Sequence, residues 1–507
     1  MKRIMGLPLI LAVLAATVQA APLKIGWAMN DISTDKPVEL GGTYYVRVSQ
    51  GMLDPLMATA LAIDNGKDCV VFVSLDFIHT PGSVVRRVRE RVKKELPDLP
   101  PEKLLFNATH THNGVHLYRG DKKLREEYGN YMAEQVFKTV KEAWQSRKPG
   151  RIAYGYDLVV TAFNRRIVYF NYRKEGIGSA PRGKVSLHGR TDVPDFSHVE
   201  GGADPFANYL FTYDMDDKLT GAIVNIGYTA QASQPGRMLS SDTWHDVRRL
   251  MAKRHPGIFV LPQVSAAGEA TYRLPYYHAA EKRSHRLMYG REPAYVGEFE
   301  RKVIAGRIMT SFDRAHTWAQ KEKFSDLPIK HTIKTLRLSP YIPTRQAYET
   351  AQDGLRKIAE YRVNPPWKDP KQRAHNLSAL NSRENVCKRV VRLYENRDKI
   401  AKIPMEFHVL RIGDVAFVSE QYEYYFEFGQ RIQARSPFIQ TFVIELSAVG
   451  GGYLATERAT ENGGYGTGYL CPVSPKGGQE IVEAAISELK ALKAMDKNTN
   501  LQKQKEI

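Results

Sequence analysis

Two histidines separated by one residue, His110 and His112, are the chemically most informative side chains of this 507-residue chain. They follow a short apolar run, residues 104–108, and precede the turn pair Asn113-Gly114. Residues two apart in an extended segment point to the same side, so both imidazoles are expected to face one pocket at a strand end. Imidazole is the commonest protein ligand of transition metals and the usual proton carrier near neutral pH. The spacing therefore predicts metal or acid-base chemistry here, although two unrelated loop histidines would look the same.

Four other clusters carry side chains suited to catalysis or ligand binding. Each one follows a predicted strand, begins a predicted helix or forms a glycine-rich turn: residues 241–246, 265–271, 419–423 and 450–453. The small residues of the second cluster would let backbone N–H groups and a hydroxyl approach a substrate closely. Taken singly, the clusters are weak signals, because a carboxylate after a strand is more often a helix cap than a ligand. By the same reasoning, His245 alone is more often a structural hydrogen-bonding residue.

Alternating strands and helices must position these side chains. The continuous apolar run at residues 69–76 predicts a buried strand, and residues 82–96 have helical spacing. Residues 103–108 then predict the strand that carries the histidines, and residues 126–146 predict a second helix. This alternation predicts an α/β fold with a layered mixed-sheet core.

The remainder of the chain predicts further elements of the same kinds. They are loops and short strands at 156–202, a hairpin at 211–214 and 221–226, a helix at 242–255, a strand at 257–264, helices within 294–324 and 344–398, paired strands at 405–418, and a strand at 438–447. One large domain, residues 21–475, is expected to contain them, with a helical insertion around 294–400. Residues 476–507 predict a C-terminal helix and a polar tail.

The first twenty residues have the composition of an export signal. Lys2 and Arg3 provide positive charge, residues 4–17 form an apolar core, and residues 18–20 resemble a cleavage site. That core is too short to span a membrane, and no later run is long enough. A secreted or periplasmic location is therefore expected, with an uncleaved anchor as the alternative. The three cysteines are widely separated and cannot form a disulfide framework.

The formal net charge of +18 favours anionic partners. An acidic polysaccharide or an anionic lipid surface would fit this charge. Nucleic acid is not expected, because the basic residues are scattered and no nucleic-acid motif is visible. A generally basic surface without a specific partner would have the same composition.

The order of the motifs resembles the neutral/alkaline ceramidase family, zinc amidases that hydrolyse the N-acyl bond of ceramide. Residues 107–114, Asn-Ala-Thr-His-Thr-His-Asn-Gly, are similar to the family's Thr-His-Thr-His-Ser-Gly block. Residues 164–166, 411–431 and 452–456 resemble its Asn-Arg, glutamate and tyrosine segments. The resemblance spans residues 23–470 and implies the ceramidase catalytic fold. It finds no counterpart of the family's C-terminal immunoglobulin-like domain after residue 475.

The resemblance implies that His110, Glu423 and Tyr453 ligate Zn²⁺ or another divalent metal. Three such ligands and an open position make a Lewis-acid site that activates water and polarises a carbonyl. His112 would then orient the substrate or assist proton transfer.

The chain also departs from the family's pattern. Where the family has its second zinc histidine, residues 225–231 contain none, and His245 is a candidate replacement. The family's Gly-Asp-Val-Ser-Pro block reads Gly-Glu-Ala-Thr-Tyr at residues 268–272, so Thr271 stands at the serine position, with Ser265 nearby. The complete set of candidates is His112, Thr271, Tyr453 and His245 as catalytic residues, Asn113, Arg165, Gly268 and Gln231 as substrate-binding residues, and His110, Glu423 and Tyr453 as metal ligands.

The leading hypothesis is a secreted metal-dependent hydrolase of an amide or ester bond, acting on a small-molecule, lipid or anionic glycan substrate. A polysaccharide lyase is one alternative, in which a metal or an arginine neutralises a uronate carboxylate while Tyr453 or His112 moves the proton. A non-catalytic binding protein on the same scaffold is another. An amidohydrolase-type barrel would need two more histidines and an aspartate, which are not evident.

Overall fold

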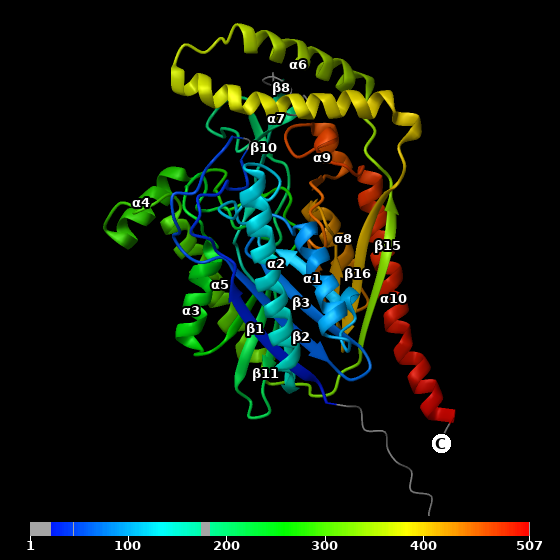
Figure 1. Ribbon diagram of the computed structural model, residues 1–507. Helices are drawn as coiled ribbons and strands as arrows, with labels where there is room; N and C mark the ends of the chain where they lie inside the picture. Colours follow the sequence, from blue (N-terminus) through cyan, green and yellow to red (C-terminus); the bar gives the residue numbers. More distant parts are fainter. Residues whose placement is uncertain (1–21, 44, 174–182, 506–507) are drawn as a thin grey trace, which may run out of the picture.

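Three β-sheets, each with helices on its outer side, pack against one another in the computed structural model (Figure 1). The structure describes residues 22–43, 45–173 and 183–505, so the predicted export signal lies outside the described residues. No helix among the described residues has both the length and the apolar character needed to cross a membrane. The predicted layered α/β fold is confirmed.

The first sheet carries the histidine pair and has the strand order β4-β3-β2-β1-β5. Its strands are β1 (Lys24–Asp31), β2 (Met57–Asp64), β3 (Cys69–Leu75), β4 (Leu104–Ala108) and β5 (Lys148–Pro149). Helices α1 (Gly82–Glu95) and α2 (Lys122–Gln145) cover its outer face. Buried valines from Val84 to Val92 give α1 its apolar face, and the Asp121 side chain caps α2 by accepting from the Leu124 N–H. This cap lies five residues before the predicted start of α2 at residue 126.

The second sheet has the order β13-β12-β11-β6. It consists of β6 (Arg151–Leu158), β11 (Phe206–Tyr213), β12 (Leu219–Ile226) and β13 (Phe259–Val264), and it is covered by α3 (Thr243–Arg254) and α5 (Glu298–Ala319). The predicted hairpin at 211–226 is confirmed as β11 and β12, which pair in antiparallel fashion. Asp242 caps α3 with its side chain, as its residue type at a helix start favours.

The third sheet has the order β15-β16-β17-β19. It consists of β15 (Ile329–Leu338), β16 (Ile403–Ile412), β17 (Val415–Ser419) and β19 (Gln440–Ile444), with α8 (Phe426–Arg435) and α10 (Pro475–Lys505) on its outer side. β15 lies between the two stretches predicted to be helical, 294–324 and 344–398, and all ten of its residues pair with β16. β15 is an edge strand rich in lysine, arginine and threonine, a composition that protects a sheet edge and hides the strand pattern.

The remaining elements are short or lie outside the three sheets. They are β7 (Phe163–Asn164), β8 (Arg166–Arg173), β9 (Gly183–Leu187), β10 (Phe196–Val199), β14 (Ala270–Thr271), β18 (Glu423–Tyr424), β20 (Tyr453–Leu454), α4 (His278–Tyr289), α6 (Arg345–Val363), α7 (Pro370–Glu395), α9 (Glu457–Asn462) and the 3-10 turns Pro101–Lys103, Arg397–Lys399 and Gly468–Leu470. Helices α6 and α7 form a hairpin across one end of the molecule, and α4 projects from its side (Figure 1). The break between α6 and α7 contains the predicted Pro365-Pro366 interruption.

The inner faces of the three sheets share one apolar core. Phe72 of β3 packs at 5.0 Å, between ring centroids, on Phe417 of β17, which stacks on Phe442 of β19 at 4.3 Å. Ile223 of β12 and Leu261 of β13 complete this cluster from the second sheet. The relative positions of the sheets, and of every side chain at their ends, depend on this shared packing.

Each sheet also contains one parallel strand pair: β3 with β4, β12 with β13, and β17 with β19. Backbone hydrogen bonds connect the segments that follow these strands. The Ala230 N–H donates to the Thr109 carbonyl at 3.2 Å, which links the first two sheets. The Glu445 N–H donates to the Val264 carbonyl at 2.9 Å, which links the second sheet to the third. The carboxyl ends of three parallel pairs therefore lie at one place.

We predict that Phe72→Ala lowers the free energy of unfolding by about 3–5 kcal/mol, because it opens a cavity where two sheets meet. Phe170→Ala on β8 is the matched control, since that ring is 63% exposed and its loss should cost no more than about 0.5 kcal/mol. Urea unfolding of both variants measures the difference. Equal effects would contradict a shared core.

Candidate functional site

His110 and His112 lie just beyond β4 with their side chains buried. His110 has a left-handed backbone, with φ of 60°, a conformation that few residues other than glycine adopt. Its Nδ1 lies 2.8 Å from the Ile78 carbonyl, which only accepts, so Nδ1 carries the proton. The His112 Nδ1 likewise donates to the Gln234 Oε1 at 2.6 Å. Both Nε2 atoms are therefore the unprotonated nitrogens of neutral rings.

These two Nε2 atoms face each other at 3.3 Å. Burial lowers the pKa of His110 to about 4 and lowers that of His112 well below its ordinary value, so neither ring is charged near neutral pH. Two lone pairs at this distance repel each other unless a cation lies between them. Two nitrogens bound to a tetrahedral zinc at about 2.0–2.1 Å would be about 3.3–3.4 Å apart. The donor chemistry and spacing of the pair therefore suit a metal ion.

Glu423 and Tyr453 reach the same place from β18 and β20, which follow strands β17 and β19 of the third sheet. They are direct partners in the short parallel pair of β18 and β20, so their side chains leave adjacent strands together. The Glu423 Oε2 lies 3.7 Å from the His110 Nε2, and the Tyr453 side chain is hydrogen-bonded to Glu423. Burial raises the pKa of Glu423. One imidazole, one carboxylate and one phenol thus converge, although His110 and Tyr453 are more than 300 residues apart in the sequence.

Arg165 brings a buried positive charge to this group. Its Nη2 donates to the Tyr453 Oη at 3.1 Å and to the Gly268 carbonyl at 2.7 Å. Burial alone would lower the pKa of Arg165, but Tyr453 and Glu423 raise it above its ordinary value. Its Nε is buried without a hydrogen-bond partner. A buried unpaired N–H group is costly, so a water molecule or a ligand oxygen would stabilise it as a hydrogen-bond acceptor.

The small residues after β13 pack directly against the glutamate segment. A Cβ at Gly268 would lie 2.3 Å from the Glu423 carbonyl oxygen, so only glycine fits there. Thr271 pairs with Phe163 between β14 and β7. Thr271 and Arg165 line a cavity of about 120 Å³. This cavity is the opening next to the buried site through which a small group could reach Arg165.

The other candidate residues lie farther from these atoms or act differently. His245 is in the first turn of α3, and no hydrogen bond joins it to His110, Glu423 or Tyr453 in the described part of the chain. The Asn113 Nδ2 donates to the Met238 carbonyl at 2.8 Å, an arrangement that holds a loop. Gln231 is buried in the segment after β12. Within residues 22–43, 45–173 and 183–505, no three His, Cys, Asp or Glu side chains form a metal site by themselves, so His110, His112 and Glu423 would not suffice without Tyr453 as a further ligand.

The structure adds residues that the motifs did not reveal. His79, four residues after β3, has its ring 5.3 Å from that of His110, and Glu423 acts electrostatically on it. Gln234 orients His112, and its own Nε2 donates to the Gly42 carbonyl at 3.2 Å. His79 could have been found from the sequence, because it is a histidine shortly after a predicted buried strand. Nothing in the sequence points to Gln234.

The comparisons with known proteins support the fold. No protein-family model and no curated protein sequence matches the chain. Among solved structures, a neutral ceramidase from Pseudomonas aeruginosa matches with a TM-score of 0.66 and 16% identity, over 94% of this chain and 75% of that one. A ceramidase complexed with C2 matches with a TM-score of 0.64 and 15% identity, over 94% and 76% of the two chains. The chain therefore has the fold of the neutral ceramidases over almost its whole length.

Buried Glu269 should make the stability of the protein depend on pH. Burial raises its pKa to about 8, and both carboxylate oxygens accept from the Phe426 N–H at the start of α8. The folded state keeps this proton to higher pH than the unfolded state, so stability falls as pH rises from about 4.5 to 8, by at most about 1.4 kcal/mol per pH unit. Glu269→Gln should remove that slope, whereas exposed Glu102→Gln should not. Unfolding free energies at several pH values test this, and equal slopes would contradict it.

Proposed function

We propose that this protein is an exported metal-dependent hydrolase of an amide or ester bond. The facing, unprotonated Nε2 atoms of His110 and His112, 3.3 Å apart and next to Glu423, are the observation that carries the proposal. An arrangement of two buried lone pairs and a buried carboxylate is unfavourable without a cation. The shared fold with neutral ceramidases favours a substrate with an N-acyl or O-acyl chain, in which a polar head group carries a lipid tail.

His110, Glu423 and Tyr453 would hold the metal ion, with the His112 Nε2 as a further nitrogen donor. Zn²⁺ is the first candidate, because it accepts nitrogen and oxygen ligands together. When bound, such an ion supplies Lewis-acid chemistry for the attack of water on a carbonyl. The Nδ1 hydrogen bonds to Ile78 and Gln234 fix both imidazole rings in the tautomer that ligation requires.

The protein's own groups would bind and orient the substrate carbonyl. Arg165 is held by Gly268 and Tyr453, and its unpartnered Nε offers a fixed donor to an oxygen that gains negative charge. Thr271 lies beside Arg165 in the same cavity and offers a hydroxyl. The cavity is small, and Arg165 and Thr271 in its lining are buried, which would limit the water around the reacting group.

A polysaccharide lyase is a second candidate, and the contact of Arg165 with Tyr453 favours it. The arginine would neutralise a uronate carboxylate, while Tyr453 or His112 would move the proton. Products that absorb in the ultraviolet band of unsaturated uronates would support this reaction and contradict the hydrolase. No reaction across a panel of acidic glycans would reject the lyase.

The purified protein is expected to contain about one divalent metal ion per chain, measured by elemental analysis. His110→Ala should abolish both the metal content and the hydrolysis of N-acyl and O-acyl lipids. His198→Ala, which removes an exposed histidine, should leave both unchanged. A wild-type protein without metal, or an unchanged His110→Ala variant, would contradict the proposal.

Gln234→Leu should weaken metal binding without unfolding the protein. The variant removes the acceptor that holds the His112 ring, and such outer partners typically contribute about 10–100-fold to metal affinity. Titration with Co²⁺, followed by its visible absorption, measures the affinity directly. An affinity equal to that of the wild type would show that the orientation of His112 has no bearing on metal binding.

A further inference from the structure

Helix α4 is unusually exposed for a helix of this length. None of its twelve residues is buried, although it lies within the chain between a site segment and α5. A ring stack of Tyr289 on Phe299, with centroids 4.1 Å apart, and an edge contact of His285 with the same ring hold it to the body. Figure 1 shows that it projects from the side of the molecule. Packing against the rest of the protein therefore does not explain why α4 has these exposed side chains.

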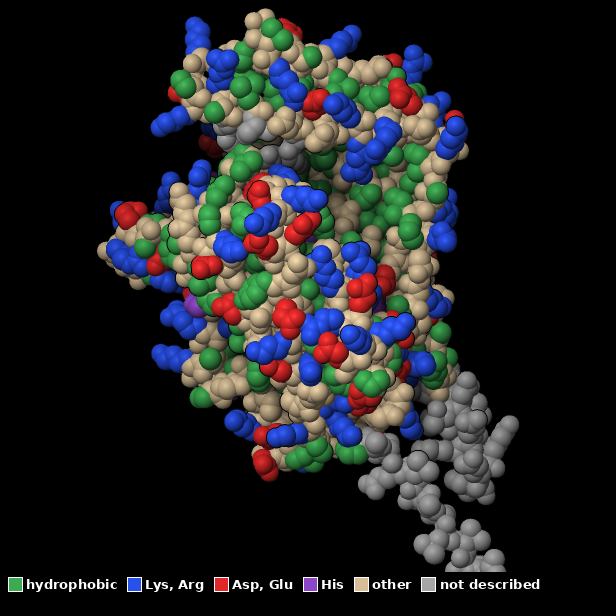
Figure 2. All heavy atoms as spheres, in the orientation of Figure 1, with side chains coloured by type: hydrophobic (Ala, Val, Ile, Leu, Met, Phe, Trp, Pro, Cys, Tyr) green, Lys and Arg blue, Asp and Glu red, His purple; other side chains and the backbone are tan. Residues whose placement is uncertain are grey.

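The exposed side chains of α4, and of Tyr277 directly before it, combine large apolar groups with basic ones. The exposed fraction is 73% for Tyr277, 63% for Leu287 and 57% for Met288. Lys282, Arg283 and Arg286 are exposed between them on the same helix. Figure 2 shows basic side chains on this projection. We call these six side chains the α4 surface.

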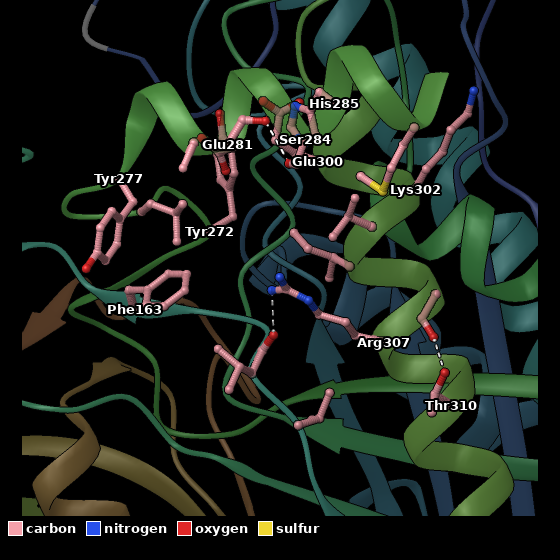
Figure 3. Close-up of a pocket in the computed structure, with 18 of the residues that line it drawn as sticks. Phe163, Tyr272, Tyr277, Glu281, Ser284, His285, Glu300, Lys302, Arg307 and Thr310 are labelled. Carbon is pink, nitrogen blue, oxygen red and sulfur yellow. Dashed lines mark hydrogen bonds between the residues drawn. The ribbon is translucent and has the colours of Figure 1, made fainter. Parts of the chain in front are cut away.

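An open groove separates α4 from α5 and keeps the helix away from the body. It has a volume of about 1220 Å³. Figure 3 shows Tyr277, His285 and Arg307 on its walls. Its apolar lining includes Leu158, Val160, Phe163, Leu274, Met288 and Ile304. Apolar side chains thus stand on both sides of α4, where they are exposed to water at a free-energy cost.

We propose that the α4 surface docks the protein on an anionic lipid bilayer. A helix with Leu, Met and Tyr on its apolar side and Lys and Arg beside them suits the boundary between head groups and acyl chains. Lys282, Arg283 and Arg286 would lie at the phosphates, and Tyr277, Leu287 and Met288 would enter the apolar region. Only Glu281 among the helix residues carries the opposite charge.

Charge and chemistry favour a bilayer over other occupants. A second copy of this chain would bring two molecules of formal net charge +18 together, with basic side chains facing basic side chains. An acidic polysaccharide would satisfy the charges but would leave Leu287 and Met288 in water. An anionic bilayer satisfies both kinds of side chain.

The α4 surface is also connected to the candidate site. His278, the first residue of α4, and Arg273, five residues before it, line the small cavity that Arg165 also lines. A docked bilayer would therefore lie near the opening to this cavity. Delivery of a lipid substrate from the bilayer rests on the proposed function, whereas docking itself does not.

Vesicle co-sedimentation tests the docking without any catalytic reaction. The full-length protein should bind vesicles of phosphatidylglycerol and phosphatidylcholine, and should not bind vesicles of phosphatidylcholine alone. The triple variant Lys282→Gln, Arg283→Gln, Arg286→Gln should lose binding by roughly 100-fold, at about fivefold for each basic side chain. Tyr277→Ser with Leu287→Ser should lose binding although the charge is unchanged.

A matched control separates a specific surface from general charge. Arg86→Gln, Lys93→Gln and Lys94→Gln remove the same three charges from exposed positions on α1 and should retain binding. In Leu287→Trp, the tryptophan emission should shift to shorter wavelength when anionic vesicles are added. Equal losses in the α1 and α4 triple variants, no emission shift, or no binding by the wild type would overturn the proposal. Self-association that the α4 variants abolish would identify a second copy as the partner instead. Binding by a metal-free protein would leave the docking intact while the proposed hydrolase fails.

Discussion

The site depends on the convergence of three parallel strand pairs at their carboxyl ends. Each sheet supplies one pair, and the shared core that includes Phe72 and Phe417 fixes the angles between the sheets. Backbone hydrogen bonds from Ala230 to Thr109 and from Glu445 to Val264 then tie the three ends together. Many polar residues that follow these strands are buried, among them His110, Thr229 and Glu445. They must satisfy one another, a neighbouring backbone group or a ligand.

Two kinds of buried polar group result from this constraint. Structural pairs contact each other directly: Arg248 donates two hydrogen bonds to Asp76, and Arg166 donates two to Glu200. The groups around His110 are incomplete, since two lone pairs face each other and the Arg165 Nε has no partner. Unpartnered buried atoms occur elsewhere in the described residues as well, but two imidazole nitrogens that face each other next to a buried carboxylate are specific to this place, and that arrangement points to a cation.

Local patterns in the sequence predicted the elements and the chemistry of single motifs, whereas long-range packing decided the rest. The apolar runs of β3 and β13 and the spacing of His110 and His112 are local features, and the structure has these strands. The edge strand β15 escaped prediction because its exposed face is charged, and Gln234 escaped because its role exists only once its loop meets His112. The hydrophobic periodicity of short sequence windows does not predict that three sheets meet or that α4 is exposed. The order of the motifs indicated the overall fold only because it resembles the order in the neutral/alkaline ceramidase family.

If the two proposals hold, the buried site and the exposed helix α4 meet different physical demands of one task. A long acyl chain is held in a bilayer by its apolar surface, so an enzyme that waits for it in water would meet almost none. The site itself must stay dry and rigid, because its imidazoles and carboxylate act through fixed positions and low polarity. These demands conflict if one surface must meet both. In this chain they are separated: sheets and shared core hold the site, while α4, which is held mainly through the ring of Phe299, presents apolar side chains to the outside. Arg165 and His278 line one cavity, so the two regions adjoin there, and the proposed function would bring the substrate to the site from this side.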